Sequence, residues 1–121
     1  MTSSTQLLDV ATVTLSPSAA PARIISGSPE CAELTIVDTG SVEIGVWEVT
    51  PGVFRSSKIG IGEVMHFISG AGHLEHADGT TSPIGPGIVI ELAPGWEGIW
   101  HVEQTTRKVY TIYSAPTEKD A

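Results

Sequence analysis

Turn signals divide this chain into short apolar runs, and that punctuation constrains its fold more than any other feature. Thirteen glycines and eight prolines are spread over 121 residues. Pro51-Gly52 is a strong turn signal, and Asp78-Gly79 is the best hairpin signal. No window longer than about two helical turns is amphipathic at the helical period. The pattern predicts an all-β domain of roughly nine to ten short strands, arranged as a sandwich, a jelly roll or a closed barrel.

The expected strands follow one another from near the N-terminus to near the C-terminus. The first, "LLDVATVTL", is expected either at a sheet edge or paired with a second subunit. Residues 16–23 predict a connector, and residues 58–62 a loop. No shift in composition marks a boundary, so residues 1–121 are expected to form one domain with flexible tails at 1–6 and 115–121. The other runs that predict strands lie within 32–40, 41–52, 53–57, 63–69, 73–85, 87–92, 96–104 and 107–114.

Charge and cysteine content disfavour several classes of partner and location. Six Lys and Arg residues against 14 Asp and Glu residues leave a formal charge of −8. Nucleic acid and anionic membrane surfaces would be repelled by such a chain. No apolar run approaches the roughly 20 residues of a membrane span, and the N-terminus lacks the pattern of a signal peptide. The single cysteine, Cys31, cannot form an internal disulfide, so a cytoplasmic location is expected.

Four stretches carry a resemblance to a known family. They are "GVWEVTPGVF", "GEVMHFISG", "GPGIVIELAPGWEGIWHV" and "RKVYTIY", and they span about residues 41–113. Together they resemble a small single-domain cupin, and they are similar to the subgroup of short cupins related to ureidoglycine aminohydrolases. The resemblance implies a cupin jelly-roll barrel, a choice that strand periodicity alone leaves open.

The resemblance also implies a metal site, which this sequence largely lacks. Cupins usually take two His and one Glu from a motif G-x5-H-x-H-x3,4-E-x6-G, and a further His from a second motif. Glu63 and Gly70 match the E-x6-G part. The two His positions fall on Ser56 and Lys58, or on Ser57 and Ile59, and the position of the further His falls on Gly98. No cofactor is therefore expected, although a divalent metal on unusual ligands stays open.

Glu63 and Lys58 are the candidate catalytic residues. A carboxylate without its metal must be hydrogen-bonded, paired with a base such as Lys58 or Arg55, or protonated with a raised pKa. Each of these states makes it a candidate acid–base group. The ammonium of Lys58, at a former ligand position, could bind an anionic group of a substrate. The plainer alternatives are a strand-end carboxylate in solvent and an exposed loop lysine.

Large aromatic residues near the barrel mouth are candidate substrate contacts. Trp96 follows the "APG" turn, and with Phe54 and Tyr110 it could stack a planar or cyclic substrate. Trp100 is a further candidate, and Arg55 could clamp a carboxylate. Trp47 is expected in the core.

Histidines provide the alternative metal site. Glu63, His66, His76 and His101 are the ligands such a site would use. His66 lies three residues after Glu63, so a regular strand would place the two on opposite faces. Strand parity therefore disfavours this site.

Two functions stay open. One is metal-independent acid–base catalysis on a small polar or cyclic metabolite, of isomerase, epimerase, dehydratase or cyclase type. The other is a non-catalytic ligand-binding or accessory cupin, with a divalent-metal cupin hydrolase or dioxygenase that uses unusual ligands as a further alternative. A small-molecule ligand and a homodimer are expected under each of them.

Overall fold

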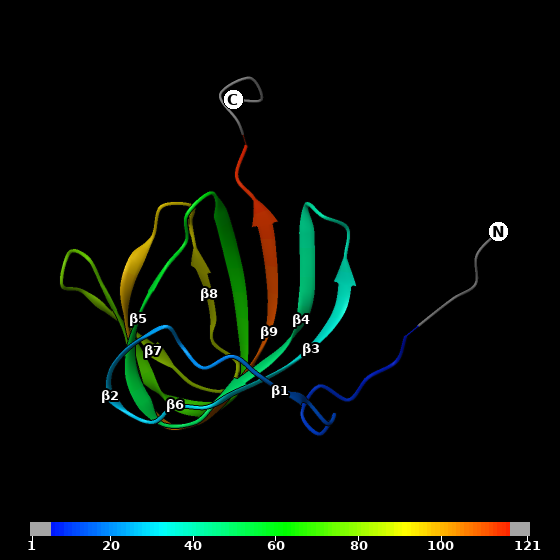
Figure 1. Cartoon of the computed structure of the whole chain (residues 1–121), viewed down its shortest axis with the longest axis horizontal. Coiled ribbons are helices and arrows are strands. Elements are labelled where there is room, and N and C mark those ends of the chain that lie inside the picture. Colours follow the sequence, from blue (N-terminus) through cyan, green and yellow to red (C-terminus); the bar gives the residue numbers. More distant parts are fainter. Residues whose placement is uncertain (1–5, 117–121) are drawn as a thin grey trace.

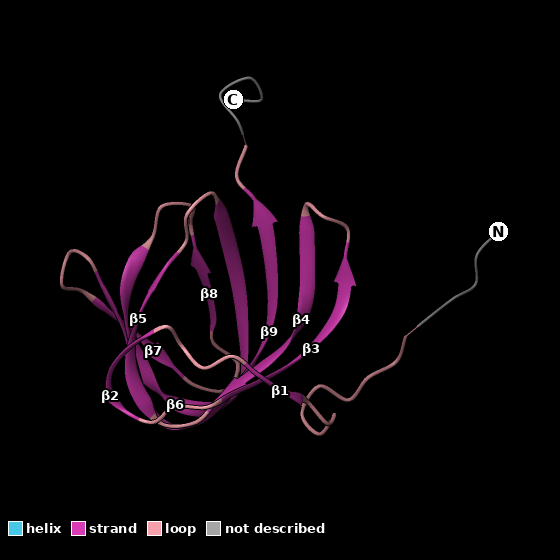
Figure 2. Ribbon diagram, viewed as in Figure 1, coloured by secondary structure: helices cyan, strands magenta, loops and turns pink. Residues whose placement is uncertain are grey.

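The computed structural model describes residues 6–116, which contain nine β-strands and no helix. The sheet curls on itself into a barrel (Figure 1), and loops join the strands at both ends (Figure 2). The predicted all-β cupin barrel is confirmed, whereas the tails predicted at 1–6 and 115–121 lie largely outside the described residues. The strands are β1 (Ser16–Ser18), β2 (Arg23–Gly27), β3 (Cys31–Asp38), β4 (Val42–Val49), β5 (Gly52–Ser57), β6 (Ile61–His76), β7 (Thr81–Ile84), β8 (Val89–Leu92) and β9 (Glu97–Ser114).

Two long strands, β6 and β9, belong to both halves of the barrel. The first half of β6 pairs with β8 and with the second half of β9, which also pairs with β4. The second half of β6 pairs with β7 and with the first half of β9, which also pairs with β5. Strands β3 and β1 extend the first half, and β2 extends the second. The sequence predicted separate short strands where the structure has these two continuous ones.

A bend in β6 between Phe67 and Gly72 makes this sharing possible. The pairing register with β9 shifts three times across this segment. Gly72 has φ +149°, and a Cβ there would collide with the carbonyl oxygen of His101. Only glycine allows this conformation and this close approach of two backbones. Gly70 and Gly72, which lie between the strands predicted at 63–69 and 73–85, are therefore the corner of one bent strand.

Alternation along β6 decides which side chains face the barrel interior. Glu63, Met65 and Phe67 are buried, whereas Val64 and His66 between them are exposed. The prediction that Glu63 and His66 face opposite ways is confirmed. The buried apolar residues form one cluster, which comprises Cys31, Val49, Phe54, Met65, Phe67, Leu74, Ile84, Leu92, Trp100 and Val102.

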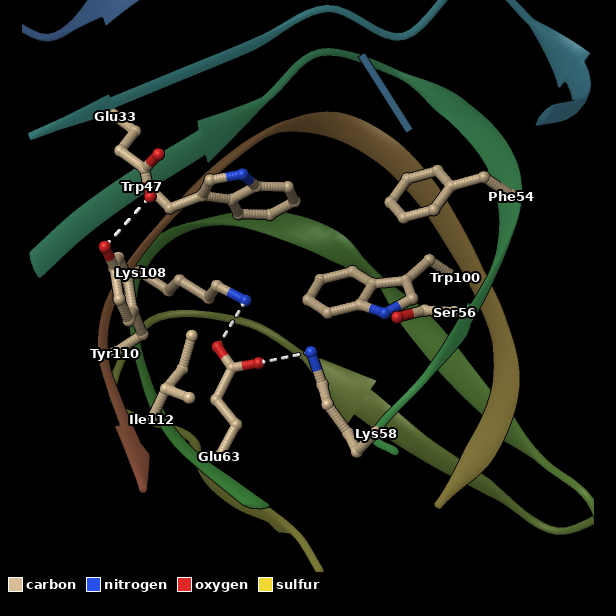
Figure 3. A pocket seen from close by; sticks show the side chains of 10 residues that line it. All are labelled: Glu33, Trp47, Phe54, Ser56, Lys58, Glu63, Trp100, Lys108, Tyr110 and Ile112. Atoms are coloured by element: carbon tan, nitrogen blue, oxygen red, sulfur yellow. Dashed lines mark hydrogen bonds and ion pairs between the residues drawn. The ribbon is translucent and has the colours of Figure 1, made fainter. Parts of the chain in front are cut away.

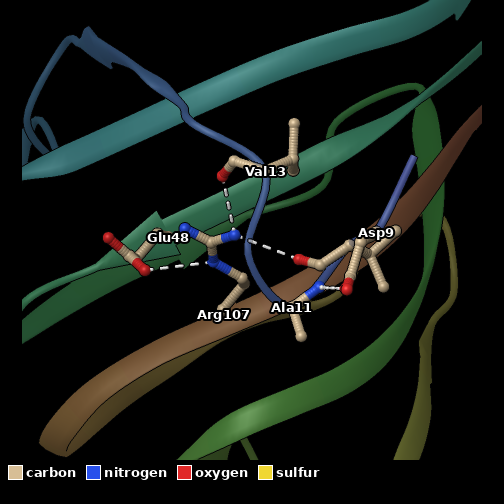
Figure 4. A network of polar contacts seen from close by, with 6 residues as sticks. Asp9, Ala11, Val13, Glu48 and Arg107 are labelled. Carbon is tan, nitrogen blue, oxygen red and sulfur yellow. Dashed lines mark hydrogen bonds and ion pairs between the residues drawn. The ribbon is translucent and has the colours of Figure 1, made fainter.

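The strand predicted at residues 7–15 is wrong, because this segment folds into a turn. Asp9 accepts hydrogen bonds from the backbone N–H of Ala11 through its side chain and from that of Val13 through its carbonyl. The guanidinium of Arg107 donates to the carbonyls of Val10 and Val13, and its Nε lies 3.1 Å from Glu48 Oε1 (Figure 4). Local hydrogen bonding of an Asx turn competes with strand pairing here.

This turn affects one further expectation. The expected homodimer rested in part on an unpaired edge at 7–15, and that segment instead lies against its own chain. The dimer stays a prediction without that support.

Candidate functional site

Three charged side chains meet inside the barrel. The carboxylate of Glu63 is 2% exposed, and its two oxygens each contact one ammonium group. Oε1 lies 2.8 Å from Lys58 Nζ, and Oε2 lies 2.7 Å from Lys108 Nζ (Figure 3). We call these residues the Lys–Glu–Lys triad. Of the states predicted for Glu63, the structure has the ion pair with Lys58 and adds a second one.

Different elements hold the three members in place. Glu63 stands on β6 between Leu92 of β8 and Ile112 of β9. Lys58 follows β5 directly, and its backbone exchanges two hydrogen bonds with the segment before β9, to the carbonyl of Trp96 at 2.8 Å and from the N–H of Gly95 at 2.7 Å. These bonds fix the point from which the Lys58 side chain reaches inward.

Lys108 is the more deeply enclosed of the two lysines. Its side chain is 6% exposed, against 14% for Lys58. Its ammonium lies 4.3 Å from the ring centroid of Trp47 and 4.8 Å from that of Trp100. It also lies 3.3 Å from Met65 Sδ. The ring faces and Glu63 both attract its positive charge, so these contacts compensate in part for the loss of water.

Burial and pairing act in opposite directions on these groups. Burial alone would raise the pKa of Glu63, but Lys108 and Lys58 together hold that pKa below its ordinary value. Burial lowers the pKa of Lys108, while the negative charge of Glu63 opposes this effect. Glu63 is therefore an ionised carboxylate in the folded protein at neutral pH.

The triad faces a cavity of about 190 Å³ with one aromatic wall. The ring of Phe54 stacks on Trp100 at 5.6 Å, and Trp47 meets Trp100 edge-on at 5.5 Å. This volume is below the range of about 300–1,000 Å³ that is usual for ligand pockets, so the space suits a compact ligand. The lining residues are Glu33, Trp47, Phe54, Ser56, Lys58, Glu63, Trp100, Lys108, Tyr110 and Ile112.

A second polar cluster lies beside the triad, around Tyr110. Its hydroxyl lies 2.6 Å from Glu43 Oε2 and 2.9 Å from Glu33 Oε2, and it donates toward both carboxylates. Burial and these two carboxylates raise the pKa of Tyr110. The side chain reaches them by crossing Gly45, where a Cβ would lie 2.6 Å from the Tyr110 hydroxyl oxygen and 2.5 Å from the Leu34 carbonyl oxygen. A glycine at this position leaves the space that the phenol ring needs.

We expect Gly45→Ala to lower the free energy of unfolding by about 1–3 kcal/mol, because the added methyl group overpacks this space. Urea denaturation followed by tryptophan fluorescence measures the change. Gly85→Ala is the matched control, because nothing lies within 4 Å of a Cβ there. Equal stability of the two variants would contradict this account of Gly45.

The structure brings together most of the predicted site residues, but not all. Phe54, Trp100 and Tyr110 line the same cavity as the triad. Arg55 is exposed on the opposite face of β5 from Phe54. Trp96 does not line the cavity; it packs against the core, and its Nε1 donates to His76 Nδ1 at 2.9 Å. A role in ligand binding stays a prediction for each of these residues.

The histidines of the alternative metal site do not converge on Glu63. His66 faces outward, and His76 bonds Trp96 and Ser82. His101 stacks on His73 at 4.3 Å and contacts Glu75. Within residues 6–116, no three His, Cys, Asp or Glu side chains are placed to hold a metal ion together.

The residues at the usual cupin metal position also do not fit a metal ion. Ser56 and Lys58, the first pair of aligned positions, both line the cavity, and Ser56 pairs with Gly98, the third. Protonated lysine has no lone pair to give, and its charge repels a cation. Both oxygens of Glu63 are already paired with ammonium groups. This donor set suits an anion instead.

Sequence analysis missed Lys108, Glu33 and Glu43, and it assigned Trp47 to the core alone. One signal could have found Lys108: it has the same strand parity as Tyr110, which was already a candidate. Register places Glu33 beside Trp47, and Trp47 beside Lys108, in one row across β3, β4 and β9. That row depends on strand pairing, which no single segment of the sequence reveals.

The model of the EutQ-like cupin domain family matches residues 37–110, more than half of the chain. The chain belongs to this family. This EutQ-like cupin is also similar to a solved structure of a protein of unknown function from Pseudomonas syringae pv. tomato, with 31% identity and a TM-score of 0.77. The match covers 87% of the present chain but only 46% of the Pseudomonas protein, so the cupin spans about half of that relative.

More distant structures share the fold. EutQ from Clostridium difficile matches with 18% identity and a TM-score of 0.71, over 90% of this cupin and 80% of EutQ. Ectoine synthase from P. lautus matches with 20% identity and a TM-score of 0.63, over 78% of this cupin and 70% of the synthase. At such identities the likeness shows the fold alone. No curated protein matches the sequence significantly.

These comparisons establish the cupin family, while the finer resemblance to ureidoglycine aminohydrolases stays a prediction.

The structure itself bears on the expected absence of a membrane span. In residues 6–116 there is no helix long and apolar enough to cross a membrane.

Proposed function

We propose that this cupin binds a compact anionic metabolite in its barrel and acts on it by proton transfer, with the Lys–Glu–Lys triad in place of a metal ion. The observation that carries the proposal is the buried Glu63 carboxylate between two ammonium groups at an aromatic-lined cavity. Two positive charges against one negative charge leave the triad with a net charge of +1. A ligand carboxylate would neutralise that excess.

The two lysines suit different parts of such a reaction. Lys108, held by Glu63 and two indole rings, is a fixed positive charge that can stabilise negative charge developing on the ligand. Lys58 is more exposed and is tethered only at its backbone and by Glu63, so it can turn toward a ligand and donate a proton. Isomerisation, epimerisation, dehydration or cyclisation next to a carboxylate also needs a base. Glu63 Oε1, freed when Lys58 turns toward the ligand, would take the proton from carbon, and Lys58 would donate its own proton to the ligand. The proton would then return from Glu63 to Lys58 across their contact of 2.8 Å.

A non-catalytic binding function is the second candidate, and one observation favours it. Both oxygens of Glu63 are occupied, and the lowered pKa makes this carboxylate a weak base. The cavity would then hold its anion without turnover.

Binding is tested first, with cyclohexanecarboxylate as the probe and isothermal titration calorimetry as the measurement. We expect Lys58→Gln to weaken binding at least tenfold, because a charged contact to the ligand contributes about 1.5–3 kcal/mol. Arg23→Gln is the matched control, because it removes one positive charge at an exposed position of β2. An equal loss in both variants would assign the effect to overall charge and would count against the cavity.

Proton transfer is tested separately, in D2O with chelator-treated protein. Small carboxylates that bind are incubated with the wild type and with Lys58→Gln, and NMR follows exchange of their C–H hydrogens. Exchange in the wild type alone supports catalysis. Binding without exchange in either protein supports the second candidate.

A further inference from the structure

The charged groups around the cavity are separated according to the sign of their charge. The Lys–Glu–Lys triad contributes a net positive charge, and the cluster around Tyr110 contributes the carboxylates of Glu33 and Glu43. Glu33 lines the cavity itself. In Figure 3, Glu33 and Lys58 lie on opposite sides of the cavity, with the aromatic wall along the space between them. The cavity therefore has a cationic end and an anionic end.

Sheet register sets the scale of this separation. Glu33 on β3 is opposite Trp47 on β4, and Trp47 is opposite Lys108 on β9. Neighbouring strands lie about 4.8 Å apart, so the backbones of Glu33 and Lys108 are roughly 10 Å apart. Both side chains line the cavity, so a ligand that contacts both ends must be short, and a single ring with one group at each end suits the cavity volume of about 190 Å³.

The hydrogen bonds of the Tyr110 cluster leave Glu33 able to take a ligand. The Tyr110 hydroxyl has one hydrogen, which two carboxylates share at 2.6 and 2.9 Å. That single hydrogen cannot satisfy four carboxylate oxygens, each of which accepts hydrogen bonds. The longer of the two contacts is the one to Glu33, the carboxylate that lines the cavity. An N–H group of a ligand, above all a cationic one, would complete its hydrogen bonding.

We propose that the substrate class of this cavity is compact zwitterions: a small cyclic molecule whose carboxylate binds at Lys58 and Lys108 and whose cationic nitrogen binds at Glu33. The inference rests on the proposed function, because it places the anionic group at the same triad. It adds a second recognition point at the opposite end. The hydroxyl of Tyr110 donates toward the Glu33 carboxylate and so helps to fix its orientation.

Three matched probes test this proposal on the wild-type protein by calorimetry. Piperidine-4-carboxylate carries both charges, cyclohexanecarboxylate only the anion, and piperidine only the cation. The ring size is the same in all three. We expect the zwitterion to bind at least tenfold tighter than either single-charge probe. Since the cyclohexane ring is the more apolar, burial of the ring alone would give the opposite order for the two carboxylates.

Variants then assign each end of the ligand. Glu33→Gln is expected to weaken the binding of piperidine-4-carboxylate at least tenfold without weakening that of cyclohexanecarboxylate, because the substitution removes a negative charge from the cavity. Lys58→Gln is expected to weaken the binding of both. The amide oxygen that Glu33→Gln introduces can still accept the Tyr110 hydrogen, which favours retention of the fold. Glu91→Gln is the matched control, because Glu91 is exposed and its replacement removes the same charge. The three-probe comparison needs no variant, so it decides the question even if Glu33→Gln fails to fold.

The outcomes separate this inference from the proposed function. If cyclohexanecarboxylate binds as tightly as the zwitterion and Lys58→Gln weakens it, the zwitterion class is wrong and the anion-binding triad stands. Failure of both carboxylates to bind the wild type would overturn both proposals.

Discussion

Replacement of Glu63 by glutamine is expected to lower the free energy of unfolding by about 3–5 kcal/mol at pH 7. The substitution keeps the shape of the side chain but leaves two ammonium groups in the barrel without their counter-charge, and removal of one partner of a buried ion pair typically has a cost of this size. Glu63 is 2% exposed, so the little water that reaches its position compensates only in part for the lost carboxylate. The change is measured by urea denaturation, with Glu91→Gln as an exposed control.

The loss should depend on pH in a specific direction. Burial already lowers the pKa of Lys108, and without Glu63 nothing in the triad opposes this. The folded variant then releases a proton below the unfolded value of about 10.4, so its stability rises with pH between the lowered pKa and about 10.4. The difference in the free energy of unfolding between the wild type and the variant should therefore become smaller from pH 7 to pH 9.5.

The pH dependence of stability in acid provides an independent test of the negative charge assigned to Glu63. The lowered pKa of Glu63 means that its contribution to wild-type stability is present above the unfolded value of about 4.3 and is lost as pH falls through the folded value. The variant lacks this contribution, so the difference in the free energy of unfolding between the two proteins should also become smaller in acid. A difference that stays constant from pH 3 to pH 9.5 would contradict the assignment of Glu63 as an ionised, doubly paired carboxylate.

The fold could be predicted because its determinants are local. Alternation places Glu63, Met65 and Phe67 on one face, and Asp78-Gly79 forms the predicted turn, with the N–H of Gly79 bonded to the carbonyl of His76 at 2.9 Å. The continuity of β6 could not be predicted in this way. Gly70 and Gly72 signal a strand end and a strand corner equally well, and only pairing with β9 decides between them.

The site residues likewise differ in whether local sequence or strand pairing determines their position. Glu63 and Lys58 could be predicted because they stand at aligned positions of a known motif, five residues apart. Lys108 could not, because it comes from 45 residues beyond Glu63 and reaches it through the pairing of β6 with β9. A second lysine changes the chemistry inferred for the carboxylate: one partner leaves a neutral pair, and two leave an excess of positive charge.

The double variant Glu63→Gln/Lys108→Met is expected to recover about 2–3 kcal/mol of the stability that Glu63→Gln alone loses. A buried ion pair can often be replaced by apolar residues of similar volume without loss of stability. Methionine fits the position of Lys108 because it is unbranched and its sulfur packs well against aromatic rings, here those of Trp47 and Trp100. Urea denaturation of both single variants and the double variant gives the coupling free energy.

Two comparisons make this result interpretable. Glu63→Gln/Lys58→Met should recover less, because Lys58 is more exposed than Lys108 and its ammonium can turn toward water. Additive losses in the Lys108 double variant would contradict the account of Lys108 as the buried charge that Glu63 stabilises. The double variant keeps the net charge of +1 but has one ammonium group where the wild type has two. A ligand carboxylate would therefore lose one of its two charged contacts, and cyclohexanecarboxylate should bind at least tenfold more weakly than to the wild type. Recovered stability together with lost binding would mean that folding does not require the triad, and that its charges serve the ligand.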